Sequence, residues 1–101
     1  MLTINHTDIV LSQVASSKTE AIQSVASSLT GKGYIEPDYV NGMLAREQQS
    51  STYLDNGIAI PHGTTDTRSM VNNTGVVVHH YPQGVDWGDG NLIYLAIGIA
   101  C

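Results

Sequence analysis

At residues 56–63 the chain reads Asn56-Gly57-Ile58-Ala59-Ile60-Pro61-His62-Gly63, and this stretch decides the predicted architecture. Ile58 and Ile60 fall on one face under a two-residue period, which predicts a short buried strand. Pro61 cannot donate a ladder hydrogen bond, so the strand should end there, and Gly63 lets the backbone turn or approach a ligand closely. The stretch therefore places His62 at the end of a strand, where an imidazole can be reached. Position alone leaves open that it is an ordinary loop histidine.

A second strand is expected directly before this stretch. The triplet Thr52-Tyr53-Leu54 has β-forming side chains, and Asp55-Asn56-Gly57 supplies residues that tolerate the positive φ angles of a tight hairpin turn. We therefore expect an antiparallel hairpin whose second strand leads into His62.

Two helices are predicted earlier in the chain. Ser17 and Glu20 form a capping-box pattern ahead of an apolar stripe with helical spacing, which ends at the glycines 31 and 33. Pro37 suits the first turn of a second helix that would run to about Glu47. The expected buried side of this helix consists of Val40, Met43 and Leu44. Near its end we expect Arg46 and Glu47 to form a solvated charge pair.

The second half of the chain is rich in β-branched residues. Residues 63–68 predict a loop or the first turn of a short helix, residues 75–81 a strand, residues 82–84 a turn, and residues 92–101 a final strand. Two helices followed by strands predict an α/β fold with a mixed β-sheet flanked by helices. The final run is the most hydrophobic in the sequence and requires cover on both faces, so we expect the chain to stop before its domain does.

Composition narrows the functional classes. The 101 residues suffice for one domain, and a net charge of −5 argues against a nucleic-acid partner or an anionic membrane surface. No apolar run reaches the length of a membrane span, and a single cysteine, Cys101, excludes an internal disulfide. We expect a cytoplasmic protein without direct membrane insertion.

Most catalytic motifs are missing from the sequence. No glycine-rich phosphate loop and no G-x-S-x-G elbow occurs. His79 and His80 are neighbours in a predicted strand, so their side chains point to opposite faces. His6 and His62 have no partner at the spacing of metal ligands. We therefore expect neither a metal nor another cofactor.

These exclusions leave His62 as a candidate nucleophile. Neutral imidazole has a free lone pair at cytosolic pH, and a phosphorylated imidazole is reactive enough to pass the phosphoryl group on. Such a transfer needs hydroxyls, backbone N–H groups and an arginine to stabilise the phosphoryl oxygens. Segments that can converge on His62 carry Arg46, Thr64, Thr65 and Arg68.

Several segments, taken in order, resemble one protein family. These segments are the runs 43–47 (Met-Leu-Ala-Arg-Glu), 51–54 (Ser-Thr-Tyr-Leu), 56–63 and 85–88 (Val-Asp-Trp-Gly), and the strand 96–100. In them the sequence is similar to the fructose/mannitol-type IIA domains of the bacterial phosphoenolpyruvate:sugar phosphotransferase system. Within that family the sequence most resembles the N-terminal IIA domains of fructose-specific diphosphoryl transfer proteins. The resemblance extends over nearly the whole chain.

The resemblance implies a phosphotransferase component that relays phosphoryl groups during sugar uptake. His62 would accept the group from an HPr-type phosphocarrier and pass it to a cysteine of the fructose-specific IIB domain, and Arg46 would stabilise the charge of the phosphate. The family gives no role to Thr64, Thr65 or Arg68, which stay candidates for binding phosphate on chemical grounds.

The resemblance also implies a difference in length. IIA domains of this family are about one and a half times as long, so we expect residues 1–101 to be a single IIA domain whose last helices would lie beyond Cys101. Exposed sheet surface would then favour self-association or a partner. The alternative function is a regulatory or interaction module that binds the carrier without relaying phosphate, and the sugar itself stays open.

Overall fold

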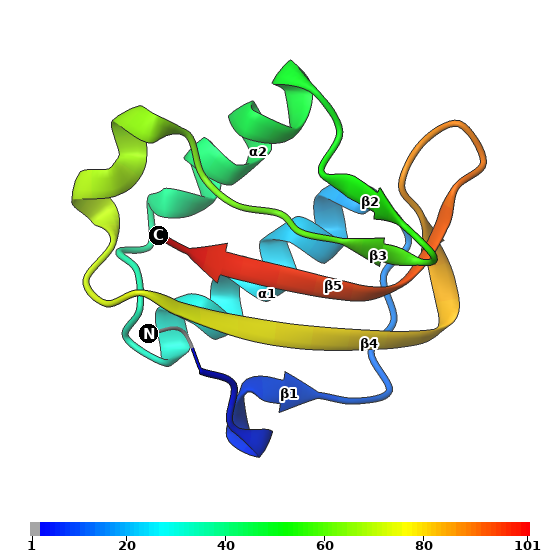
Figure 1. Ribbon diagram of the computed structural model, residues 1–101, viewed down its shortest axis with the longest axis horizontal. Coiled ribbons are helices and arrows are strands. Elements are labelled where there is room, and N and C mark those ends of the chain that lie inside the picture. The colour runs from blue at the N-terminus through cyan, green and yellow to red at the C-terminus, as the bar shows by residue number, and fades with distance from the viewer. Residues whose placement is uncertain (1–2) are drawn as a thin grey trace.

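The computed structural model describes residues 3–101 (Figure 1). In chain order the elements are a 3-10 helix η1 (His6–Asp8), β1 (Ile9–Val10), α1 (Lys18–Gly31), α2 (Tyr39–Gln49), β2 (Tyr53–Asp55), β3 (Ile58–Ala59), a 3-10 helix η2 (Thr65–Met70), β4 (Gly75–Asp86) and β5 (Leu92–Ala100).

Helix α1 begins where the sequence predicts. The Ser17 hydroxyl accepts a hydrogen bond from the Glu20 backbone N–H at 3.1 Å, which satisfies one of the unpaired donors of the first turn. The Glu20 carboxylate accepts from the hydroxyl of Ser16 instead of completing the capping box. The predicted apolar stripe is buried, and its members are Ala21, Ile22, Val25, Ala26 and Leu29.

The strands form one five-stranded sheet in the order β1-β4-β5-β3-β2. β1 pairs with β4 and β3 pairs with β5 in parallel, while β4–β5 and β2–β3 are antiparallel. The prediction of a mixed sheet flanked by helices is therefore confirmed, and β5 lies at its centre (Figure 1).

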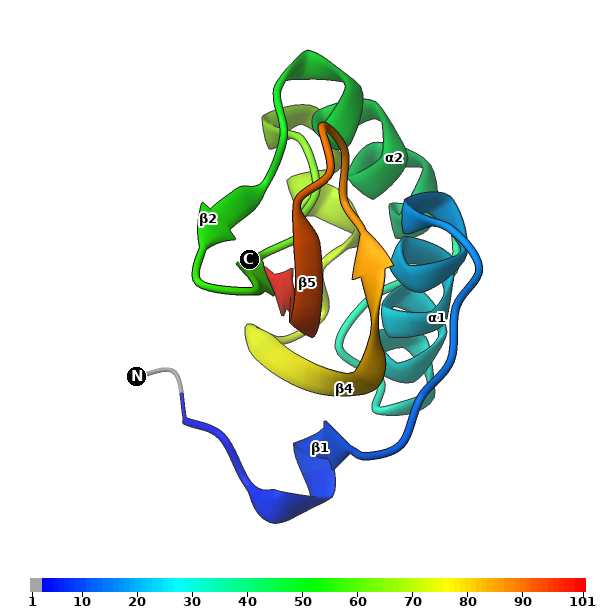
Figure 2. The same cartoon turned by 90° about the vertical axis from the view of Figure 1, so that its right-hand side faces the viewer.

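Both α-helices lie on the same side of the sheet. α1 packs across β4 and β5, and α2 packs against α1 (Figure 2). Gly98 of β5 faces Val25 of α1 so closely that a Cβ atom at Gly98 would lie 3.0 Å from the Val25 side chain. The core forms between this face and α1.

The opposite face of the sheet is apolar, and within residues 3–101 neither α-helix covers it. Val78 pairs with Ile97 on this face, and both are half-buried, while Ile9 of β1, opposite Val78, is 43% exposed. Apolar patches of this kind on a sheet favour association. Self-association stays a prediction, which sedimentation velocity tests by the presence or absence of a species heavier than the monomer.

Two predictions about strands were wrong. The turn expected at Pro82–Gly84 lies inside β4, where the pairing with β5 is irregular between His80 and Val85. Pro82 has no N–H for the ladder, and such an irregularity accommodates it without ending the strand.

The second correction concerns the short strand before His62. Its fully buried residue is Ala59, whereas Ile58 and Ile60 are half-buried. Ala59 pairs with Ala96 on the helix-covered face, so the two isoleucines on the alternate positions point toward the open face.

None of the helices in residues 3–101 combines the length and the hydrophobicity needed to cross a bilayer.

Candidate functional site

The predicted hairpin carries the site. β2 and β3 pair antiparallel around a turn in which Asn56 (φ +53°) and Gly57 (φ +77°) adopt left-handed conformations, as a two-residue hairpin loop requires. The Ile60 N–H donates to the Thr52 carbonyl at 3.0 Å and extends this pairing toward Pro61. The hairpin prediction is confirmed.

The backbone at His62 is held against β5. The N–H of Ile99 donates to the carbonyl of Pro61 at 3.0 Å, and His62 forms an isolated parallel bridge with Ile99. Pro61 thus ends the regular strand, as predicted, while the chain stays beside β5 for one further residue.

The hydrogen bond of the His62 ring fixes its tautomer. Nδ1 lies 2.8 Å from the carbonyl oxygen of Ile60. Because a carbonyl oxygen only accepts hydrogen bonds, Nδ1 carries a proton, and in the neutral ring the free lone pair is therefore on Nε2. The neutral, half-buried ring can thus offer Nε2 to an electrophile.

A hollow of about 310 Å³ lies beside His62. The structure brings all the predicted site residues to it from three different segments: Arg46 from α2, Thr64 from the loop after His62, and Thr65 and Arg68 from η2. Its full lining is Arg46, Gln49, His62, Gly63, Thr64, Thr65, Asp66, Arg68 and Cys101.

Arg46 is fixed at the rim of this hollow. It lies in the last turn of α2 and is half-buried, and its Nη1 donates to the carbonyl of Ser50 at 2.7 Å. A guanidinium held by one of its nitrogens can present its other donors to an anion.

Glu47, expected to be solvated, is buried instead. Its carboxylate accepts from the backbone N–H of Thr52 at 3.0 Å and from the Thr52 hydroxyl, and Lys18 Nζ lies 3.4 Å away. The prediction that Glu47 forms a solvated pair with Arg46 is wrong, because the chain after α2 folds back and places Thr52 over Glu47. On the same helix Val40 and Leu44 are half-buried, while Met43 is fully buried as predicted.

Sequence reasoning missed Tyr39, the first residue of α2. Its side chain is fully buried, and its hydroxyl accepts a hydrogen bond from the N–H of Gly63, at 2.9 Å. Burial raises the pKa of Tyr39 above the ordinary tyrosine value, so the hydroxyl stays protonated. No motif in the sequence marks this residue.

The remaining histidines take no part in the hollow. His79 is buried under α1 with Nε2 at 2.8 Å from the Ser28 hydroxyl, and burial lowers the pKa of its imidazole. Within residues 3–101, no group of three or more His, Cys, Asp or Glu side chains is arranged to hold a metal ion.

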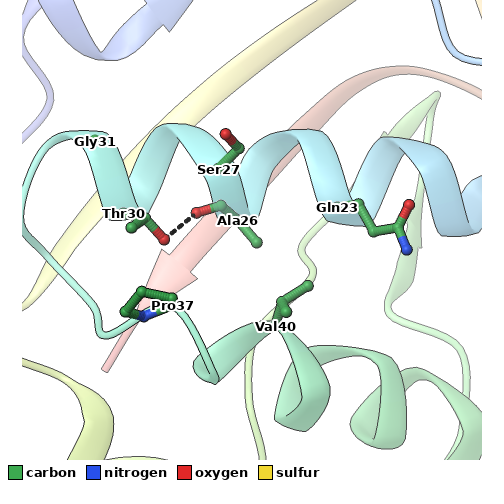
Figure 3. A pocket seen from close by; sticks show the side chains of 7 residues that line it. All are labelled: Gln23, Ala26, Ser27, Thr30, Gly31, Pro37 and Val40. Atoms are coloured by element: carbon green, nitrogen blue, oxygen red, sulfur yellow. Dashed lines mark hydrogen bonds between the residues drawn. The ribbon is translucent and has the colours of Figure 1, made fainter.

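A second, more open groove of about 500 Å³ separates α1 from α2 (Figure 3). Within α1, on the wall of this groove, Thr30 donates its hydroxyl hydrogen to the carbonyl of Ala26 at 2.9 Å. The side chains that line it carry no ionisable group: Gln23, Ala26, Ser27, Thr30, Gly31, Pro37 and Val40. This groove therefore offers no ionisable acid or base, whereas the hollow beside His62 does.

Comparison with known proteins agrees with this geometry. The multiphosphoryl transfer protein of Vibrio cholerae is 60% identical over 100 residues, which are 99% of this chain and 25% of that protein. The chain thus spans about a quarter of the length of this relative.

Two solved structures share the fold. The crystal structure of the mannitol IIA protein from Escherichia coli superposes with a TM-score of 0.94 at 42% identity, covering 98% of this chain and 72% of that one. A complex of enzyme IIA for mannitol with phosphorylated enzyme IIB from the same organism gives a TM-score of 0.92 at 39% identity, covering 100% and 72%.

The family resemblance noted in the sequence is confirmed by a match that extends over residues 3–101. The chain belongs to the family described as "Phosphoenolpyruvate-dependent sugar phosphotransferase system, EIIA 2".

Proposed function

We propose that this chain relays phosphoryl groups in the cytoplasm during sugar uptake, with Nε2 of His62 as the accepting atom. The observation that carries the proposal is the 2.8 Å contact between His62 Nδ1 and the Ile60 carbonyl, beside a hollow that also holds Arg46. With Nδ1 occupied by this hydrogen bond, the nucleophilic lone pair of the neutral ring is on Nε2, which is free to react.

The donor in this proposal is the phosphohistidine of an HPr-type carrier. The Nε2 lone pair attacks the phosphorus, a new N–P bond forms, and the N–P bond of the carrier breaks with its electron pair returning to the carrier imidazole. The Nδ1–H bond to Ile60 stays in place and stabilises the positive charge that develops on the His62 ring.

The acceptor is a cysteine of the fructose-specific IIB domain. Its thiolate attacks the phosphorus on His62, an S–P bond forms, and the N–P electrons return to Nε2. Because the metaphosphate-like group carries charge on its three oxygens, Arg46 and the hydroxyls of Thr64 and Thr65 are suited to stabilise it. Neither step needs a cofactor.

Fructose is proposed from the sequence resemblance, whereas the solved relatives are named for mannitol. The two IIB types therefore serve as parallel acceptors. We expect faster transfer from phosphorylated His62 to the fructose-type IIB, and faster transfer to the mannitol-type IIB would reverse the sugar assignment.

Intact-mass analysis tests the relay. The chain is incubated with phosphoenolpyruvate, the general enzyme of the system and HPr, beside His62→Ala and the matched variant His80→Ala. We expect one acid-labile phosphoryl group on the wild type and on His80→Ala, and none on His62→Ala. An unmodified wild type that still binds HPr would instead support the regulatory or interaction module.

A further inference from the structure

The parallel pairing at His62 is interrupted at the next residue. Ile99 donates its N–H to the carbonyl of Pro61 at 3.0 Å. In a regular parallel ladder, Gly63 would next donate its N–H to the Ile99 carbonyl. The Gly63 N–H instead donates to the hydroxyl of Tyr39 at 2.9 Å.

The hydroxyl of Tyr39 completes the interrupted ladder. It accepts from Gly63 and donates its own hydrogen to the Ile99 carbonyl at 3.3 Å. The side chain is fully buried. One hydroxyl thus links the Gly63 N–H to the Ile99 carbonyl by two bonds in series, directly after the bridge between His62 and Ile99.

Close packing holds this arrangement from two further directions. A Cβ atom at Gly63 would lie 2.6 Å from the Tyr39 ring and 2.7 Å from the Thr67 hydroxyl. A Cβ atom at Gly42 would lie 2.5 Å from the Thr67 methyl group. These glycines therefore let α2 and η2 pack tightly behind the backbone of His62.

We propose that Tyr39 is a positioning residue for His62: its hydroxyl connects Gly63 to the Ile99 carbonyl of β5 and thereby keeps the His62 ring on the Ile60 carbonyl with Nε2 facing the hollow. The kinetic part of this inference rests on the proposed phosphoryl relay. The geometric part concerns only the ring of His62.

Tyr39→Phe removes the hydroxyl and keeps the ring. The Gly63 N–H and the Ile99 carbonyl then either lose their partner or form a direct hydrogen bond with each other. We expect both outcomes to shift the backbone of His62. We expect the maximal rate of phosphorylation by phospho-HPr to fall about tenfold to a hundredfold, as misplacement of a reacting group does. The half-saturating concentration of phospho-HPr should change by less than about threefold, because the carrier does not contact the buried hydroxyl.

The ring itself gives an independent readout. Long-range ¹H–¹⁵N NMR spectra report which imidazole nitrogen carries the proton. We expect the wild-type His62 signals to show the Nδ1–H tautomer and those of Tyr39→Phe to lose part of that preference.

Tyr81→Phe is the matched control. Tyr81 is also a buried tyrosine, and its hydroxyl lies 3.5 Å from Nδ1 of His79. This variant loses a buried hydroxyl elsewhere in the core. We expect it to leave the His62 signals and the phosphorylation rate at wild-type values.

The inference is overturned if Tyr39→Phe shows wild-type His62 signals and the wild-type rate, or if Tyr81→Phe alters both to the same extent. A wild type that takes no phosphoryl group defeats the proposed function, and the ring signals still decide the role of Tyr39. If Tyr39→Phe does not fold, hydrogen exchange of the wild-type Gly63 amide decides. Protection of about a hundredfold or more supports the bond to Tyr39, and exchange at the rate of an unstructured chain overturns it.

Discussion

Glu47, in the last turn of α2, accepts two hydrogen bonds from Thr52, one from its backbone N–H at 3.0 Å and one from its hydroxyl. The carbonyl of Thr52 in turn accepts from the N–H of Ile60, and the carbonyl of Ile60 accepts from Nδ1 of His62. The buried Glu47 carboxylate is thus connected to the His62 ring by three consecutive contacts. Through them, the helix that carries Arg46 and the hairpin that carries His62 are held together.

Glu47→Gln should lower the free energy of unfolding by about 1–3 kcal/mol, because the new amide nitrogen cannot accept from Thr52 and leaves a buried donor unpaired. Urea unfolding followed by circular dichroism measures the change. Glu36→Gln is the control, since the carboxylate of exposed Glu36 accepts only from the Asn72 side chain, at 2.8 Å, among the described hydrogen bonds. It should stay within about 0.5 kcal/mol of the wild type. Equal losses in the two variants would contradict the role assigned to Glu47.

Gly63→Ala should destabilise the fold by about 1–3 kcal/mol, because its methyl group meets the Tyr39 ring and the Thr67 hydroxyl at less than contact distance. Gly31→Ala makes the same chemical change at a helical position with no atom within 4 Å of the new methyl group. Thermal unfolding of the pair measures the difference. A Gly63→Ala protein as stable as Gly31→Ala would show that the packing behind His62 is loose.

Arg46→Ala should slow phosphorylation by phospho-HPr about tenfold to a hundredfold, because it removes a donor aimed at the developing charge. Arg46→Lys should recover only part of the rate, since an ammonium lacks the planar fork. Arg68→Ala makes the same charge change at an exposed position of the same hollow. Stopped-flow or quench measurements on the three variants rank them. An Arg68 effect larger than that of Arg46 would transfer the stabilising role to Arg68.

The unfolding free energy should fall as the pH drops below about 6.5, because burial holds the pKa of His79 below the ordinary histidine value of 6.5. Below that pH the unfolded chain binds a proton on His79 that the folded chain does not. The contribution of neutral His79 to the free energy of unfolding is therefore complete above about pH 6.5 and is lost progressively below it. Urea unfolding between pH 7.5 and 5 measures the slope. His79→Gln, which cannot titrate, should flatten the curve over this range. Parallel curves for the two proteins would exclude His79 as the source.

A second acid-sensitive contribution should come from Asp8 at lower pH. The backbone N–H of Asn5 holds the pKa of the Asp8 carboxyl below the ordinary aspartate value of 3.8. Hydrogen bonds from Tyr34 and Lys32 lower this pKa further, whereas burial of the carboxylate raises it. This contribution is present above about pH 3.8 and is lost as the carboxylate is protonated, so it does not overlap the range set by His79.

Local patterns in the sequence were sufficient for the elements that carry the site. The serine cap of α1, the Asn56-Gly57 turn and the proline after β3 each follow from the chemistry of one or two residues. The convergence of Arg46 and His62 followed from the family resemblance together with the requirements of phosphoryl chemistry, and the structure places both at one hollow.

Two of the wrong predictions depended on partners that the local sequence pattern does not specify. Ala59 is the buried residue of β3 because β5 lies beside it, and Glu47 is buried because Thr52 returns over the end of α2. Tyr39 has no periodic or motif signal, since its importance comes from Gly63 and Ile99, which are 24 and 60 residues away in sequence. Local patterns do not specify such partners.

The most direct test of the relay is to locate the phosphoryl group on the protein. The chain, labelled with ¹⁵N in its histidines, is phosphorylated by phospho-HPr, and long-range ¹H–¹⁵N spectra identify the modified nitrogen. We predict a phosphoryl group on Nε2 of His62, with the proton still on Nδ1. A phosphoryl group on Nδ1 of His62, or on His6, His79 or His80, would contradict the central claim.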